Sequence, residues 1–380
     1  MMRALLPIAL LLRFVFALNG VPPSNSTVRV SRFNVHNLIG IDVTKRVWAP
    51  VLPGHESYVF PVYSFLVEHG PRKLLFDIGI RKDPENSPPV LAADFTDGTF
   101  YVEPQRDITD VLNEAGIPLS SIEGVVWSHS HFDHIAHMGR FPNSTALIVG
   151  AETDISTFPY NPNSALHESY FAGRHVHKID FALSKLKFND LKAVDYFGDG
   201  SFYLVDAPGH LPGHLTALAR VTPSPKATFI LLGGDSFHHP GEARPRPALQ
   251  KSFPCPGHLL DSAAAHVSTA HFFSPGSHDG PHGFDLRTRA APLLSIATGP
   301  TSYTLDPDTA EVTLEKIARW DADEDVLVLI AHDASVVGNV TRRGGLPYHP
   351  LALNEWKSGG WKEQAVWNFL DVKGPAWIFS

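Results

Sequence analysis

Residues 128–134 place four potential metal ligands in one short segment, Ser-His-Ser-His-Phe-Asp-His. The ligands are the three imidazoles and the carboxylate of His129, His131, Asp133 and His134. Imidazole nitrogens combined with a carboxylate oxygen suit Zn²⁺ or another first-row divalent ion. In a chain with 21 histidines, a His-rich turn can also arise by chance. The apolar, β-prone residues 124–127 favour a metal site, because a buried strand leading into a polar loop holds ligands rigidly.

Three further potential ligands follow apolar segments that are typical of β-strands. They are His210, in a Gly- and Pro-rich loop after residues 201–205, Asp235, after residues 227–232, and His332, after residues 326–330. A single histidine after a strand is usually a hydrogen-bonded polar end. Four strands that each deliver a His or Asp predict seven ligands that converge. His214, four residues beyond His210, is predicted to brace the loop in preference to binding metal.

The segments that position these ligands alternate between strand and helix patterns. Two β-rich segments at 62–67 and 74–78 are joined by a Gly-Pro turn, which predicts a hairpin. Residues 107–115 predict a helix, because Asp107 is a suitable N-cap and Gly116 would end it. No repeat of fixed period is visible, and this excludes solenoids and propellers.

The composition indicates one large globular domain. With 380 residues, 43% of them hydrophobic and 18% charged, the chain can bury a large core. A formal net charge of −8, spread along the chain, argues against nucleic acid as a partner. The single cysteine, Cys255, excludes an intrachain disulfide and a thiolate metal site. We interpret it as a small apolar residue in preference to a catalytic thiol.

The first 20 residues fit a secretory signal peptide better than part of a domain. A basic residue precedes an apolar run over residues 4–18, which Arg13 interrupts, and a turn-prone segment follows. The run is too short and interrupted to favour a stable membrane partner. Glycosylation triplets begin at Asn25, Asn143 and Asn339. We expect a secreted or secretory-pathway glycoprotein, with an uncleaved anchor or a mis-started reading frame as alternatives.

The motif His-X-His-X-Asp-His, together with the ligands at later strand ends, resembles the metallo-β-lactamase superfamily over roughly residues 28–340. The resemblance implies a fold of the α+β class, an αβ/βα four-layer sandwich with two mixed sheets face to face and helices outside. It also implies that Asp77-Ile78-Gly79 forms a turn that supports the site. We expect residues 21–345 to form the hydrolase domain and residues 346–380 an extension packed on it.

The resemblance also implies a dinuclear site with two Zn²⁺ per chain. One ion would be bound by His129, His131 and His210, the other by Asp133, His134 and His332, and Asp235 would bridge both. Two such ions lower the pKa of a shared water toward neutrality, so that a metal-bound hydroxide would attack an ester-like carbonyl. Asp133 and the second ion would hold the leaving group. We find no convincing Gly-X-Ser-X-Gly elbow that would favour a serine nucleophile.

Within the superfamily, residues 207–214 and His332-Asp333 are similar to quorum-quenching lactonases and related fungal hydrolases. The resemblance implies a small-molecule ester, lactone or lactam substrate, with a lactone preferred and a lactamase or acyl-thioesterase as alternatives. In those lactonases a tyrosine three positions after the bridging Asp donates a hydrogen bond to the substrate. His238 stands there in this chain. It is either a general acid, because imidazole titrates near neutrality, or a supporting or surface residue.

Other functions fit the chain less well. A mononuclear iron dioxygenase of this fold would keep three ligands, whereas seven candidate ligands are present here. A glyoxalase II type of thioesterase would add a basic helical C-terminal domain, and the residues after Gly345 are few and Trp-rich. RNA processing is disfavoured by the negative charge. The oligomeric state stays open.

Several residues near the expected site have two interpretations. Arg244 or Arg246 can pair with a carboxylate of the substrate or remain solvated. Trp356, Trp361 and Trp367, with the aromatic block at 271–273, can wall an apolar cleft, although such residues more often belong to the core. His137, three residues after His134, is expected to line the pocket or to support a ligand without binding metal.

Overall fold

The computed structural model describes residues 20–51, 54–266, 291–337 and 351–377. The predicted signal segment, the aromatic block at 271–273 and the triplet at Asn339 lie outside the described residues. Asn25 and Asn143 are exposed, and their glycosylation stays a prediction. Among the described residues, no helix has the length and apolar character needed to cross a membrane.

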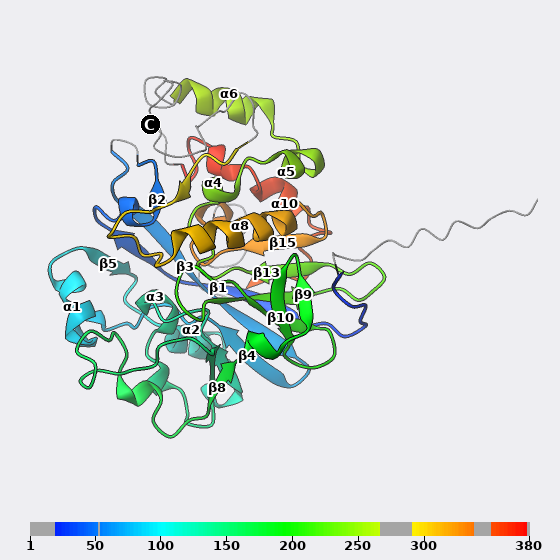
Figure 1. The fold of residues 1–380 in the computed structure, drawn as a ribbon. Coiled ribbons are helices and arrows are strands. Elements are labelled where there is room, and N and C mark those ends of the chain that lie inside the picture. Colours follow the sequence, from blue (N-terminus) through cyan, green and yellow to red (C-terminus); the bar gives the residue numbers. More distant parts are fainter. Residues whose placement is uncertain (1–19, 52–53, 267–290, 338–350, 378–380) are drawn as a thin grey trace, which may run out of the picture.

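The first sheet has eight strands in the order β16-β1-β3-β4-β6-β7-β8, with β5 paired to β1 (Figure 1). The bounds are β1 Arg29–Gly40, β3 Tyr58–His69, β4 Arg72–Phe76, β5 Phe100–Glu103, β6 Gly124–Val126, β7 Ala146–Gly150, β8 Val176–Ile179 and β16 Leu351–Ala352. The antiparallel pair of β3 and β4 is the predicted hairpin, which is thereby confirmed. From β4 through β6 and β7 to β8 the strands run parallel.

The second sheet has six strands in the order β15-β13-β12-β11-β10-β9. The bounds are β9 Leu186–Phe188, β10 Leu191–Asp195, β11 Phe202–Asp206, β12 Leu215–Arg220, β13 Phe229–Leu232 and β15 Val326–Leu329. All pairs are antiparallel except β13 with β15, which is parallel. A small separate sheet joins β2 (Trp48–Ala49) to β14 (Ser295–Ile296).

Two capped helices cover the outer faces of the sheets. The helix α2 (Ile108–Glu114) begins after Asp107, whose carboxylate accepts hydrogen bonds from two backbone N–H groups of the first turn, as predicted. The helix α8 (Pro307–Asp321) begins after Asp306, which accepts from the backbone N–H of Thr309 at 3.1 Å. The other helices are α1 Pro89–Thr96, α3 Phe132–Ile135, α4 Pro240–Ala243, α5 Pro247–Ser252, α6 Gly257–His266 and α10 Trp361–Ala365.

Alternate side chains of the central strands enter two different cores. In β13, Ile230 and Leu232 pack between the two sheets, whereas Phe229 and Leu231 pack in the core that includes α8. The strand β15 divides its side chains in the same way. Because both faces of the strand are buried, its sequence is a continuous apolar run without alternation. The layers are α2, the first sheet, the second sheet and α8, which confirms the four-layer sandwich.

Residues 351–377 are integrated into the fold. The strand β16 pairs with β1, and Trp356 is fully buried between the sheets. Trp361 packs against the same core, and Trp367 is buried in a neighbouring cluster. The core interpretation therefore holds for these three tryptophans, and the domain boundary at 345 stays a prediction.

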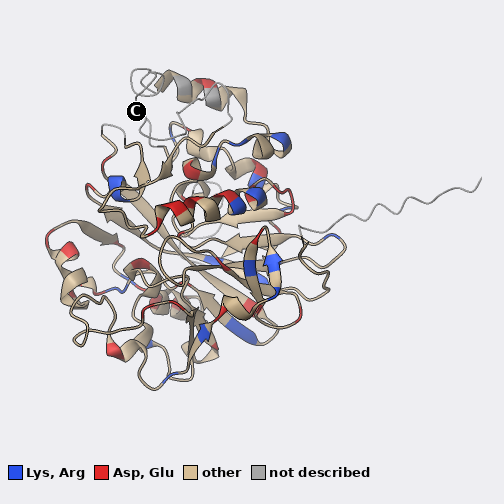
Figure 2. Ribbon diagram, in the orientation of Figure 1, with Lys and Arg blue, Asp and Glu red and all other residues tan. Residues whose placement is uncertain are grey.

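Charged residues of both signs are interspersed along the described chain, as on α8 (Figure 2). Arg244 is buried, and its Nε and Nη2 donate to the two carboxylate oxygens of Asp321, both at 2.8 Å. Its Nη1 donates to the carbonyl of Val366 at 3.0 Å. Arg246 donates to Glu315 on α8 at 2.5 Å. Both expectations for Arg244 are therefore wrong, because its donors are used inside the core.

Replacing Arg244 by Met should lower the free energy of unfolding by about 3–5 kcal/mol, because Asp321 would keep a buried charge without its partner. Equilibrium unfolding in urea measures this loss. The matched control is Arg319→Met, whose pairing with Asp190 joins side chains that are 55% and 67% exposed. The control should cost no more than about 1 kcal/mol. Equal losses in the two variants would contradict the structural role of Arg244.

Candidate metal centre

The segment after β6 is fixed by a carboxylate at the end of the neighbouring parallel strand. Asp77 follows β4, and its Oδ1 accepts from the backbone N–H of Ser128 at 2.7 Å. Its Oδ2 accepts from Ser128 Oγ at 2.8 Å and from His134 Nδ1 at 2.9 Å. Because His134 donates through Nδ1, its Nε2 keeps a free lone pair. The predicted supporting turn is thus present, and it orients one of the seven predicted ligands.

The remaining predicted ligands come from the ends of other strands. His129 and His131 lie between β6 and α3, which carries Asp133 and His134. His210 lies on the loop between β11 and β12. Since β13 and β15 are parallel neighbours, Asp235 and His332 emerge at the same sheet edge. The chain packs tightly there: a Cβ on Gly209 would lie 2.2 Å from the backbone of Ala310 on α8.

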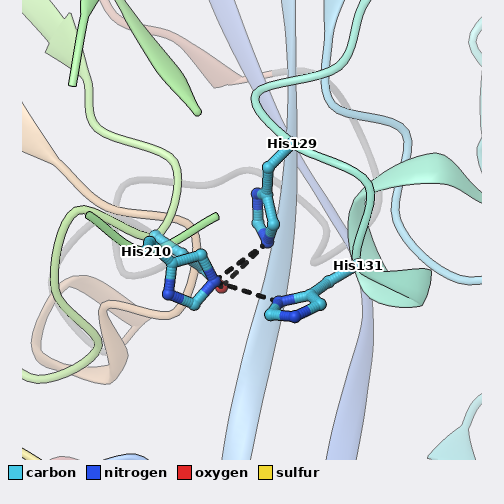
Figure 3. A group of neighbouring side chains, drawn as sticks. His129, His131 and His210 are labelled. Atoms are coloured by element: carbon cyan, nitrogen blue, oxygen red, sulfur yellow. Dashed lines mark hydrogen bonds and ion pairs between the residues drawn. The ribbon is translucent and has the colours of Figure 1, made fainter. Parts of the chain in front are cut away.

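The first ligand group consists of His129, His131, His210 and Asp235. His210 Nε2 lies 3.1 Å from His129 Nε2 and 3.0 Å from His131 Nδ1 (Figure 3). Asp235 Oδ2 is 3.6 Å from the Nε2 atoms of both His129 and His210. Tetrahedral Zn–N bonds would place ligand nitrogens about 3.3 Å apart. The spacing of these nitrogens therefore fits one bound ion.

The second ligand group consists of Asp133, His134 and His332. Asp133 Oδ2 lies 3.3 Å from His332 Nε2, and Asp133 Oδ1 lies 3.7 Å from His134 Nε2. Asp235 also reaches this group, with Oδ2 at 3.2 Å from His134 Nε2 and Oδ1 at 3.4 Å from His332 Nε2. Asp235 thus lies between the two groups, and all seven predicted residues surround one site.

Backbone carbonyls and hydroxyl groups fix the orientation of the imidazoles. His332 Nδ1 donates to the carbonyl of Pro61 at 2.9 Å, which leaves Nε2 as the ligand atom. His210 Nδ1 lies 3.2 Å from Thr304 Oγ1. His214 Nδ1 donates to the carbonyl of Ala207, and His214 Nε2 accepts from the backbone N–H of Asp235 at 3.1 Å. His214 therefore braces two ligand loops, as predicted. Pro61 and Thr304 were not identified from the sequence.

Two buried polar atoms of the ligand groups have no hydrogen-bond partner within the described residues. They are His134 Nε2 and Asp235 Oδ1. Burying a polar atom without a partner is costly, and imidazole lone pairs that converge at about 3 Å repel one another. A divalent cation would satisfy these atoms and separate the lone pairs. The residues present therefore fit a divalent metal.

The pKa shifts differ between the two ligand groups. Burial lowers the pKa of His134, but Asp235 and Asp133 raise it well above its usual value. Burial also lowers the pKa of His332, but the carboxylates of Asp235 and Asp133 outweigh this effect and raise the pKa to about 10. The pKa values of His129 and His210 fall well below normal through burial and neighbouring imidazoles. The carboxylates thus attract positive charge, which a proton or a metal can supply.

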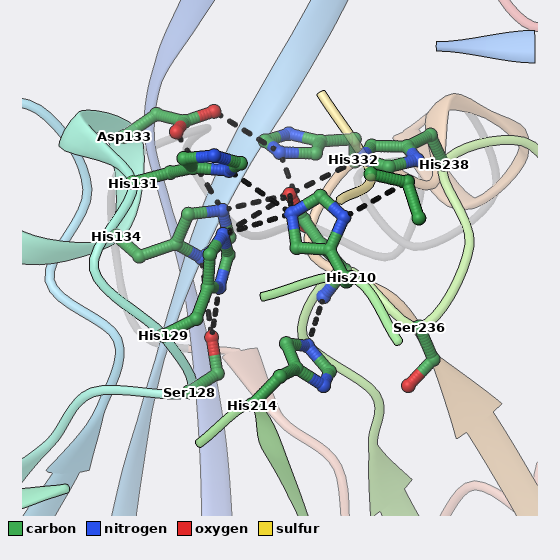
Figure 4. Close-up of polar contacts among 12 residues, drawn as sticks. Ser128, His129, His131, Asp133, His134, His210, His214, Ser236, His238 and His332 are labelled. Carbon is green, nitrogen blue, oxygen red and sulfur yellow. Dashed lines mark hydrogen bonds and ion pairs between the residues drawn. The ribbon is translucent and has the colours of Figure 1, made fainter. Parts of the chain in front are cut away.

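His238 lies at the same site and is buried, so the surface interpretation is wrong. Its Nε2 lies 3.3 Å from Asp235 Oδ2, and its ring is parallel to that of His332 (Figure 4). Glu242 Oε2 accepts from the backbone N–H groups of His238 and His239, each at 2.7 Å. Burial raises the pKa of Glu242 to about 7. The hydrogen bonds to Glu242 thus fix the backbone of the loop that carries His238.

A cavity of about 280 Å³ opens onto the two ligand groups. Its walls are Leu38, Val43, Val47, Phe60, Phe100 and Phe132, with Asp94 and Tyr303, and its inner end is formed by His131, Asp133, Asp235, His238 and His332. His137 is not among the lining residues, and its ring lies 5.7 Å from that of Tyr170. Asp94 and Tyr303 could not be predicted from the sequence, because neither lies in a motif.

Comparisons with known proteins agree with this geometry. A sequence model described as the metallo-β-lactamase superfamily matches residues 57–332. The chain is 36% identical to the metallo-hydrolase mfmC of Annulohypoxylon moriforme, over 94% of this chain and 90% of that protein. It is 33% identical to the gamma-lactamase FDB1 of Fusarium pseudograminearum, over 92% of this chain and 83% of the relative.

A longer relative and a solved structure extend the comparison. The chain is 39% identical to the cytochrome P450 monooxygenase mpaDE of Penicillium brevicompactum over 93% of its length, but spans only 38% of that protein. A crystal structure of a quorum-quenching N-acyl homoserine lactone hydrolase has a TM-score of 0.51, with 15% identity over 83% of this chain and 96% of that chain, which shows the shared fold. With the family match covering both ligand groups, the chain belongs to the metallo-β-lactamase superfamily of hydrolases.

Proposed function

We propose that this chain is a dinuclear zinc hydrolase that opens the ring of a small lactone. The observation that supports this most is the position of Asp235, whose oxygens lie 3.2 to 3.6 Å from imidazoles of both ligand groups. Imidazole-rich donor sets with few carboxylates favour zinc over magnesium or calcium. The apolar cavity beside the groups suits a small organic substrate.

The reaction adds one water across the ring C–O bond. The acyl carbon gains the hydroxyl oxygen, and the ring oxygen leaves with a proton, so that the product is a hydroxy acid. Bound divalent ions would lower the pKa of water toward neutrality and polarise the carbonyl. The walls from Leu38 to Phe132 hold the apolar body of the substrate and exclude bulk water, so that its carbonyl faces the inner end of the cavity.

We assign His238 as the proton donor to the ring oxygen. It lines the inner end of the cavity, and its Nδ1 has no hydrogen-bond partner among the described residues. Asp133 cannot take this role: burial raises its pKa, but His134 and His332 lower it to about 2, so it remains a carboxylate. Asp133 instead serves as a ligand and holds the His332 ring in place.

A lactam is the second candidate substrate. The gamma-lactamase of Fusarium pseudograminearum matches most of this chain, and a lactam ring differs from a lactone by a nitrogen in place of the ring oxygen. The same proton donation would then produce an amine. A screen over lactones, β-lactams, aryl lactams and acyl thioesters, with chelator-treated protein as the control, tests the proposal and separates the alternatives.

Protein purified without chelator should contain close to two zinc ions per chain, because two complete ligand groups share Asp235. Elemental analysis measures the content. Chelation should remove both ions and abolish hydrolysis, and added zinc should restore it. One iron per chain would instead favour the dioxygenase alternative and refute the dinuclear hydrolase.

Replacing Asp235 by Ala should lower metal content and hydrolysis together, because its carboxylate contacts both ligand groups. Elemental analysis and the rate of lactone opening are measured on the same samples. The matched control is Asp206→Ala, which removes a carboxylate at the end of β11 that belongs to neither ligand group. Full metal content and activity in Asp235→Ala would remove the bridging assignment.

Replacing His238 by Phe should leave both metals bound and slow turnover by roughly 100-fold, since a positioned acid typically contributes at least this much. The variant keeps the ring volume while removing both nitrogens. Metal content and kcat are measured, with His175→Phe, an exposed histidine outside the site, as the control. Unchanged rates across the lactone panel would show that His238 is not the proton donor.

A further inference from the structure

We propose that Tyr303 is a catalytic hydrogen-bond donor to the substrate carbonyl oxygen and that Arg46 positions it. This inference rests on the proposed function, since it assigns a role in the same cavity. Tyr303 carries the only hydroxyl group among the residues that line the cavity. Its ring lies 6.3 Å from that of His131, on the side of the first ligand group.

The hydroxyl group of Tyr303 has its proton available. Arg46 Nη1 donates a hydrogen bond to Tyr303 Oη at 3.2 Å. A guanidinium has no acceptor, so the phenolic proton must point elsewhere. Among the described residues, Tyr303 Oη donates to no acceptor, and Tyr303 lines the cavity. A substrate oxygen in the cavity is therefore the natural acceptor.

The charge of Arg46 strengthens this donor. Its guanidinium carbon lies 5.7 Å from the centre of the Tyr303 ring. A hydrogen bond from a cation polarises the phenol and makes its O–H a better donor. Burial raises the pKa of Tyr303, although Arg46 lowers it, so the phenol keeps its proton at neutral pH. The Tyr303 hydroxyl is thus a neutral hydrogen-bond donor that is polarised by the neighbouring Arg46 guanidinium.

Hydrogen bonds to two other segments of the chain, at Arg46 and at His210, hold the loop of Tyr303 in place. Its backbone N–H donates to the carbonyl of Arg46 at 2.9 Å. The next residue, Thr304, contacts His210 Nδ1 through its hydroxyl, and the backbone N–H of Leu305 donates to the carbonyl of His210 at 2.9 Å. The loop is therefore fixed both to the backbone of Arg46 and to the candidate ligand His210, and the hydroxyl has little freedom to move.

A hydrogen-bond donor in this position suits the hydrolysis of a carbonyl compound. During hydrolysis the carbonyl oxygen gains negative charge as water adds to the acyl carbon. A fixed donor aimed at that oxygen stabilises the transition state more than the substrate. Arg46 is not among the cavity-lining residues, so it acts through Tyr303 and is a positioning residue.

The test is Tyr303→Phe, measured on the lactone or lactam that the wild-type protein opens fastest. We expect kcat to fall roughly 100-fold with little change in KM, as for loss of one donor to a developing oxyanion. Metal content and melting temperature should stay at wild-type values. The matched control is Tyr170→Phe, because Tyr170 likewise interacts with an arginine, Arg81, and does not line this cavity.

Variants of Arg46 test the positioning role. Arg46→Met should lower kcat by a smaller factor than Tyr303→Phe, and Arg46→Lys should recover part of the loss because it restores a cationic donor. Arg46→Met combined with Tyr303→Phe should be no slower than Tyr303→Phe alone. Equal rates for wild type and Tyr303→Phe, together with equal affinity for γ-butyrolactam, would overturn the proposal while leaving the proposed hydrolysis intact.

Binding of γ-butyrolactam, followed by calorimetry, gives a second readout. A several-fold weaker affinity in Tyr303→Phe supports the hydrogen bond even if turnover is limited by another step, and an equal affinity together with equal rates overturns it. If the wild-type protein neither opens nor binds any lactone or lactam, the proposed function fails, and the role of Tyr303 fails with it.

Discussion

The site depends on one buried carboxylate that lies between two sets of imidazoles. Asp235 is 3% exposed, and it contacts nitrogens of His129, His210, His134 and His332. A buried anion requires compensating positive charge. For the same reason the pKa of His332 is raised, because the carboxylate stabilises the protonated imidazole. Bound divalent cations would supply this positive charge and would separate the converging lone pairs. Folding of the strands thus creates a place where cations are needed.

In each sheet, a pair of parallel neighbouring strands ends at the same edge and places polar side chains there. The pairing of β4 with β6 places Asp77 beside the segment that carries His129, and the pairing of β13 with β15 places Asp235 beside His332. The strands themselves are apolar on both faces, and polar chemistry begins only where each strand ends. Burial of the strands therefore supplies the rigidity that keeps the candidate ligand atoms of each group within 4.8 Å of one another.

The ligand residues could be predicted because each belongs to a local pattern. The segment from His129 to His134 is a dense motif, and His210, Asp235 and His332 each follow an apolar strand. The groups that orient them could not be predicted in the same way: Pro61 offers only a backbone carbonyl, and Thr304 lies in no motif. The expectations for Arg244 are wrong because a Pro-rich segment is typical of an exposed loop. The buried partner of Arg244, Asp321, lies 77 residues away in the sequence.

The candidate ligands and the cavity walls come largely from separate parts of the chain. The ligand groups occupy strand ends, whereas the cavity walls come from β1, β3, β5 and the segment around Arg46. Tyr303 also lines the cavity but comes from a distant segment, and 257 residues separate it from Arg46. Its loop is tied to His210 through Thr304, so the cavity wall and the first ligand group are connected in the structure. The contact between Arg46 and Tyr303 thus links the apolar wall to the reacting centre.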